Sequence, residues 1–161
     1  MHTVFLGIGS NIQPEANILK TAGKIGLLCR ILAFSSHVIT PPLENRQEEN
    51  YINAVWKIET DLSPENLKEQ LRRIEYQLGR RRTEDRYAAR EIDLDILVYD
   101  GKIVDDSVSR RDFVYGPLLE IEPGINIPGL DNNSEKAETF REKYRLSGLK
   151  QKLEKEYLNG P

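Results

Sequence analysis

The chain has 161 residues, a formal net charge of -3 and a sequence pI near 5.5. This length predicts a single domain with a core of its own. The acidic balance argues against a dedicated nucleic-acid binder, which usually carries a large basic surplus. No apolar run approaches the roughly 18 residues of a membrane span, and no signal peptide is evident. The single cysteine, Cys29, excludes an intramolecular disulfide and is in keeping with a reducing cytoplasm. We expect a cytoplasmic monomer whose partners are small molecules.

The first part of the chain predicts three strands and a helix. Residues 3–11 indicate a short buried strand that ends in a Gly-Ser-Asn turn, and residues 14–30 follow with apolar positions at helical spacing. Residues 31–40 and 51–60 each predict a strand. The irregular segment between them is too long for a tight turn, and such loops often carry binding residues.

The second part begins with the most secure helix. Ser63 and Pro64 give an N-cap and a first-turn proline, and the helix is expected to end at Gly79. An acidic strand is expected within residues 88–99, and a short strand at Ile103. The order strand, helix, strand, strand, helix, strand predicts a ferredoxin-like α+β sandwich, an antiparallel sheet with helices packed on it.

The acidic strand lies in "AAREIDLDILVY", residues 88–99. In an extended chain Glu91, Asp93 and Asp95 share one face, where like charges repel unless they are paired or bind a cation. Two aspartates at this spacing can hold Mg²⁺, but the same pattern also occurs on solvated strand faces.

Residues 79–90, just before this strand, contain five arginines against two acids. Arginines beside a metal pair favour phosphoryl transfer, because both neutralise a polyphosphate. The alternative for each arginine is a solvated turn with surface salt bridges, which stabilise a protein little. The sequence has no P-loop, and two histidines argue against a histidine-rich metal site.

Five blocks occur in a fixed order between residues 3 and 128: "GIGSN", "TPPLENRQEENYINAV", "IEYQLGRRR", "REIDLDILVYDG" and "RDFVYGPLLEIEP". Together they resemble the motifs of the hydroxymethyl-dihydropterin pyrophosphokinase family of folate biosynthesis. The resemblance implies transfer of pyrophosphate from ATP to the hydroxymethyl group of a dihydropterin, with release of AMP. We expect a catalytic domain over residues 1–133. The charge and weak helical periodicity of the rest predict a charged, helical extension over residues 134–161.

The resemblance further implies roles for individual residues. Two Mg²⁺ ions and the triphosphate would be held by Asp93 and Asp95. Three loop arginines would act on nucleotide or substrate: Arg80, Arg82 and Arg90. The pterin would be bound by Thr40, Pro41, Leu43, Tyr51, Asn53, Tyr87 and Phe113. Four further residues would lie near the nucleotide: Glu75, Ile96, Arg110 and Arg111.

The sequence departs from the family pattern around the nucleotide. Only fifteen residues separate Asp95 from Arg111, and the usual proline-histidine segment is absent. Elsewhere, Tyr87 and Ala89 stand where the family usually has Trp and Pro, so we expect a less rigid lid over the pterin. The missing proline-histidine segment concerns the nucleotide. We therefore expect weak ATP binding, with Lys102 or Arg110 as substitutes for the missing contact.

Two alternatives to the pyrophosphokinase stay open. One is a pterin-binding module of the same fold with little turnover. The other is a Mg²⁺-dependent enzyme that cleaves phosphodiesters with the same acidic pair and arginines.

Overall fold

The computed structural model describes residues 1–42, 49–81, 89–130 and 133–158. Its strands are β1 (His2–Ser10), β2 (Arg30–Phe34), β3 (His37–Thr40), β4 (Tyr51–Thr60), β5 (Asp93–Tyr99), β6 (Lys102–Ile103) and β7 (Arg145–Ser147). Its helices are α1 (Pro14–Leu28), α2 (Pro64–Gln77), α3 (Ser107–Arg110), α4 (Asp112–Ile121), α5 (Asn133–Lys143) and α6 (Leu149–Tyr157). Among the described residues, no helix is both long and apolar enough to cross a membrane.

The described strands form one antiparallel sheet in the order β6-β5-β1-β4-β3-β7, with β2 also paired to β4. Strand β1 is central, because β4 pairs on one side of it and β5 on the other. In this register Gly9 lies opposite both Asn53 and Asp93. The pairing thus brings together two predicted site residues that are 40 positions apart in the sequence.

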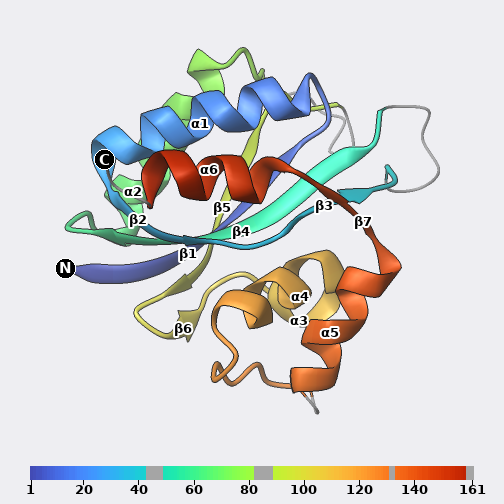
Figure 1. The fold of residues 1–161 in the computed structure, drawn as a ribbon. Helices are drawn as coiled ribbons and strands as arrows, with labels where there is room; N and C mark the ends of the chain where they lie inside the picture. The colour runs from blue at the N-terminus through green and yellow to red at the C-terminus, as the bar shows by residue number, and fades with distance from the viewer. Residues whose placement is uncertain (43–48, 82–88, 131–132, 159–161) are drawn as a thin grey trace.

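Helices cover both faces of the sheet (Figure 1). Helices α1, α2 and α6 lie on one face, over a core that includes Leu6, Trp56 and Leu71. Helices α3, α4 and α5 lie on the other face, over a smaller core that includes Phe5 and Leu118. The predicted α+β class, an antiparallel sheet with helices packed on it, is confirmed.

Two details of the first strands differ from expectation. The turn expected at Gly9, Ser10 and Asn11 is wrong for its first two residues, since β1 continues through Ser10, which pairs with Ile52. The single strand expected over residues 31–40 is interrupted. The segment divides into β2 and β3 at Ser36, because the N–H and hydroxyl of Ser36 donate to the Glu120 carboxylate of α4 rather than to a neighbouring strand.

The helix predicted after Ser63 is confirmed as α2. The Ser63 hydroxyl accepts the N–H of Asn66 at 3.2 Å, and Pro64 occupies the first turn. The chain leaves the helix through Gly79, whose φ of 105° is a conformation that glycine adopts without strain.

The carboxyl-terminal part contains more regular structure than predicted. Helix α4 occupies a segment to which no element was assigned, and β7 separates the two helical stretches of the tail. Leu149 and Leu153 of α6 are buried in the main core. The tail therefore packs on the sheet, while a domain boundary at residue 133 stays a prediction.

Candidate active site

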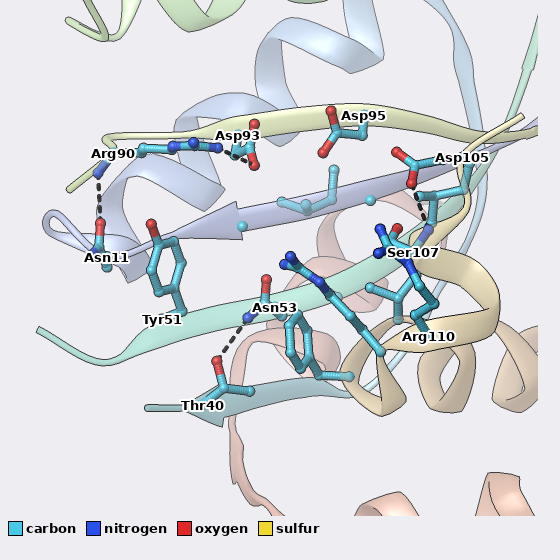
Figure 2. Close-up of a pocket in the computed structure, with 18 of the residues that line it drawn as sticks. Asn11, Thr40, Tyr51, Asn53, Arg90, Asp93, Asp95, Asp105, Ser107 and Arg110 are labelled. Atoms are coloured by element: carbon cyan, nitrogen blue, oxygen red, sulfur yellow. Dashed lines mark hydrogen bonds and ion pairs between the residues drawn. The ribbon is translucent and has the colours of Figure 1, made fainter. Parts of the chain in front are cut away.

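A cleft of about 430 Å³ opens on the sheet face that carries α3 and α4 (Figure 2). Its walls come from β1, β3, β4, β5 and the α3–α4 segment. The predicted site residues that line it are Thr40, Pro41, Tyr51, Asn53, Arg90, Asp93, Asp95, Arg110, Arg111 and Phe113. Three other predicted site residues, Leu43, Arg82 and Tyr87, lie outside the described residues.

The floor of the cleft is the second half of β1, where Gly7 and Gly9 line it. A Cβ added at Gly9 would lie 2.9 Å from Oδ1 of Asn53, and one at Gly7 would press on Leu97. Glycine at these two positions therefore leaves room for the Asn53 and Leu97 side chains, which also line the cleft. Two glycines at alternate positions of a strand indicate close approach to one face, a signal that the turn prediction missed.

Asp93 and Asp95 lie at alternate positions of β5 and both line the cleft. Glu91 lies before β5 and does not line the cleft, so the expectation that it shares their acidic face is wrong. A third carboxylate, Asp105, comes from the segment that leads into α3 (Figure 2). No sequence pattern had predicted a role for Asp105.

Asp93 is paired with two arginines, in line with the expectation that the carboxylates of the acidic strand need positive partners. Nη1 of Arg80 lies 2.9 Å from Oδ1 of Asp93, and Nη1 of Arg90 lies 2.9 Å from Oδ2. The same Arg80 nitrogen lies 2.6 Å from Oε2 of Glu75. Arg80 thus links a helix carboxylate to the acidic strand.

Glu75 is a buried residue of α2 that stands behind β5. Its Oε2 accepts the backbone N–H of Leu94 at 2.8 Å. Burial raises the pKa of Glu75, and the Leu94 N–H and the Arg80 charge offset part of this rise. Neither Glu75 nor Arg80 lines the cleft, so their predicted contacts with nucleotide or substrate stay predictions.

Negative charge accumulates around Asp95. Asp95 is exposed within the open cleft, but desolvation by the cleft walls raises its pKa to about 7, and the charges of Asp93, Asp105 and Glu75 act in the same direction. Arg80 offsets only part of this effect. A bound cation would relieve the repulsion, because it favours the ionised carboxylates.

The opposite wall offers groups suited to a flat, polar ring. Nδ2 of Asn53 donates to the Thr40 hydroxyl at 2.9 Å, which fixes the side-chain amide beside the floor. Tyr51 and Phe113 line the same cavity from β4 and α4, and the Arg111 guanidinium lies 5.8 Å from the Phe113 ring centroid. Rings and a fixed amide together can stack on and hydrogen-bond a heterocycle.

The far end of the cleft is formed by α3 and the residues before it. Arg110 lines the cavity and pairs with Asp106 at 2.9 Å, while Asp105 accepts the N–H of Ser107 at 2.9 Å. Lys102 is exposed on β6 and does not line the cavity. Ile96 also does not line it, because its side chain packs against the core on the opposite face.

The family model for 7,8-dihydro-6-hydroxymethylpterin-pyrophosphokinase matches residues 5–123. The chain belongs to this family. The family suggested by the five sequence blocks is therefore confirmed.

Three relatives of the family carry the name 2-amino-4-hydroxy-6-hydroxymethyldihydropteridine pyrophosphokinase. The protein of Methylorubrum extorquens is 38% identical over 142 residues, which cover 80% of this chain and 88% of the relative. That of Haemophilus influenzae is 36% identical over 139 residues, 80% of this chain and 86% of the relative. That of Aquifex aeolicus is 32% identical over 137 residues, 80% of this chain and 85% of the relative.

Proposed function

We propose that this chain transfers pyrophosphate from ATP to 6-hydroxymethyl-7,8-dihydropterin, giving the pterin diphosphate and AMP in folate biosynthesis. One observation carries the proposal. The acidic pair Asp93 and Asp95 shares a single cleft with Asn53, Tyr51 and Phe113. A pterin held by the second group of residues would place its hydroxymethyl arm toward the first.

The reaction needs little covalent chemistry from the protein. The hydroxymethyl oxygen attacks the β-phosphorus of ATP, the bond from that phosphorus to the α–β bridging oxygen breaks, and AMP leaves. The hydroxyl proton passes to water. Positioning and charge neutralisation therefore supply most of the rate enhancement.

Asp93 and Asp95 fit Mg²⁺, which prefers carboxylate oxygens and commonly completes its coordination with water and substrate phosphates. The raised pKa of Asp95 supports this assignment, because a carboxylate that is desolvated and surrounded by the charges of Asp93, Asp105 and Glu75 gains from a bound cation. When bound, two Mg²⁺ ions would neutralise the triphosphate. The protein's own part is to hold the two carboxylates at alternate positions of a rigid strand.

In this proposal the arginines that line the cleft contact different parts of the nucleotide. Arg90 and Arg111 line the cleft near the carboxylates and the Phe113 ring, where they can contact the phosphates. Arg110 lies at the α3 end, where the nucleotide would extend. We also propose that the enzyme is a cytoplasmic monomer. The single cysteine, Cys29, is in keeping with a reducing compartment. Light scattering tests the oligomeric state.

An AMP-release assay tests the function directly. Purified protein with ATP and Mg²⁺ is expected to release AMP only when 6-hydroxymethyl-7,8-dihydropterin is present, with formation of the pterin diphosphate. Pterin binding without AMP release would favour the binding module. Release of nucleotides from nucleic acid in the absence of pterin would favour the phosphodiester enzyme.

A further inference from the structure

One face of α4 packs closely against α5. Asp112, Gly116 and Glu120 are four residues apart, so they lie along one side of the helix. A Cβ added at Gly116 would overlap the ring of Phe140, which is 2% exposed. Glu120 pairs with Arg141 at 3.1 Å. Helix α5 therefore packs closely along the length of α4, beneath the sheet (Figure 1).

The end of this contact lies beside the cleft. Oδ2 of Asp112 is 2.6 Å from Nζ of Lys143, and Oδ1 accepts the Tyr144 hydroxyl at 2.6 Å. Burial raises the pKa of Asp112, but these two partners more than offset it, so the net pKa is lowered and the carboxylate is ionised at neutral pH. The neighbours of Asp112 in the chain are Arg111 and Phe113, which both line the cleft.

Among the described residues, no side-chain hydrogen bond caps the start of α4, whose N-cap residue is Arg111. Two short polar contacts from the end of α5 hold Asp112 instead. Because a helical turn is rigid, fixing Asp112 also fixes the backbone from which Arg111 and Phe113 project.

The same carboxyl-terminal segment reaches the other wall of the cleft. Immediately after Tyr144, β7 pairs with β3, with Arg145 opposite Ile39 and Leu146 opposite Val38. Thr40, the last residue of β3, lines the cleft and accepts the hydrogen bond of the Asn53 amide. Residues 143–147 therefore touch both the helix wall and the strand wall.

We propose that Tyr144 and Lys143 are positioning residues for the substrate cleft, acting through Asp112 on Phe113 and Arg111. This inference rests on the proposed function for its effect on pterin binding. It gives the carboxyl-terminal segment a specific task, which is to hold the stacking ring of α4 at a fixed distance from the Asn53 amide.

The test uses Tyr144→Phe, which removes only the hydroxyl, and the double variant Lys143→Met/Tyr144→Phe. The matched control is Tyr157→Phe, the same chemical change on α6, where the tyrosine ring packs near Gly23 and Gly26 on the opposite face of the sheet. The full-length proteins are compared by pterin fluorescence titration at 25 °C. Backbone hydrogen exchange of residues 111–116 is measured on the same ligand-free proteins.

We expect Tyr144→Phe to raise the pterin Kd about 5- to 10-fold, as the loss of a hydrogen bond to a charged group suggests, and the double variant to raise it further. Exchange at the start of α4 should become faster in both. Tyr157→Phe should match the wild type in both measurements. Equal pterin Kd values and equal exchange in Tyr144→Phe and Tyr157→Phe would overturn the proposal, even if the unfolding temperature fell.

The exchange measurement needs no substrate and keeps the two hypotheses apart. If the wild type bound no pterin, the proposed function would be wrong. Faster exchange at residues 111–116 in Tyr144→Phe alone would still support the bracing of α4, and unchanged exchange would overturn it.

Discussion

Nη1 of Arg80 lies 2.9 Å from Oδ1 of Asp93, and this contact joins the arginine-rich segment to the acidic strand. The Arg80 side chain is only 10% exposed, and its other carboxylate partner, Glu75, is 5% exposed. The Arg80–Glu75 pair therefore differs from a surface salt bridge, because each of the two buried charges is neutralised by the other rather than by water.

Removing Arg80 should destabilise the protein. In Arg80→Ala the buried Glu75 loses its 2.6 Å partner, and breaking a buried pair in this way costs on the order of 3 kcal/mol in the free energy of unfolding. Arg73→Ala, which breaks the exposed pair with Glu69, should cost less than about 1 kcal/mol. Urea unfolding measures both, and similar losses would contradict the assigned role of burial.

The acidic pair should be required for turnover and not for folding. Asp95→Asn is expected to abolish AMP release, because it removes a carboxylate assigned to Mg²⁺ and keeps the shape of the side chain. Thermal stability should hold or rise, since the mutation relieves repulsion from Asp93 and Asp105. Asp61→Asn, an exposed position outside the cleft, is the control. Near-normal AMP release by Asp95→Asn would remove the metal assignment.

Asn53 should contribute to pterin affinity. Its amide is fixed by the Thr40 hydroxyl at 2.9 Å, and Asn53→Ala would leave polar groups of the bound pterin unpaired. The expected loss is about 1 to 3 kcal/mol, or roughly 5- to 150-fold in Kd. Fluorescence titration checks this, with the exposed Asn66→Ala of α2 as control. Equal affinities would exclude Asn53 from the pterin site.

Nucleotide affinity should depend on Arg110 and not on Lys102. Both were candidates to replace the missing proline-histidine segment, but only Arg110 lines the cleft. Arg110→Ala is expected to weaken binding of a non-hydrolysable ATP analogue with Mg²⁺ by roughly 10-fold, as loss of a charge-assisted hydrogen bond implies. Lys102→Ala serves as the matched control in calorimetric titration. Sub-micromolar affinity that neither mutation changes would show that the shortened segment is no handicap.

His37 should make stability fall in mild acid. It is fully buried, its Nε2 accepts the Trp56 indole N–H at 3.1 Å, and burial lowers its pKa to about 4 from about 6.5 in the unfolded chain. As the pH falls, the unfolded chain is therefore protonated at this histidine before the folded protein is. The free energy of unfolding should be greatest above pH 6.5 and should fall by about 3 kcal/mol as the pH approaches 4 and below.

Comparison with His37→Gln isolates this effect, because glutamine can still accept from the indole. Asp95, with a pKa of about 7, titrates in the same range with the opposite sign, but it does so equally in both proteins. The free energy of unfolding of the wild type should fall more steeply between pH 6.5 and 4. Parallel profiles would contradict a buried neutral His37.

Local patterns were enough to predict some elements. The cap at Ser63 and the alternation of Asp93 and Asp95 with apolar residues depend on near neighbours, so both were predicted correctly from the sequence. The pairing of β5 with β1 depends on distant contacts. Periodicity carries no information on which strand lies beside which.

Other features were missed because distant contacts create them. Helix α4 contains Gly116 and Pro117, both weak helix formers, and it is stabilised by packing against Phe140 and the sheet. Asp105 reaches the cleft only because the short β5–β6 turn returns the chain toward Asp95. The division between β2 and β3 depends on Glu120, which lies 84 residues after Ser36.

The hydrogen bond from the Leu94 N–H to Glu75 has a consequence for association between molecules. Strand β5 pairs with β6 through Val98 and Tyr99 alone, so the first half of β5 is an edge of the sheet. A sheet edge with unpaired backbone N–H groups can pair with a strand from a second chain, which is a common route to aggregation. Here the Glu75 side chain occupies the Leu94 donor. The carboxylate that holds Arg80 in place thus also discourages strand addition beside the proposed catalytic pair.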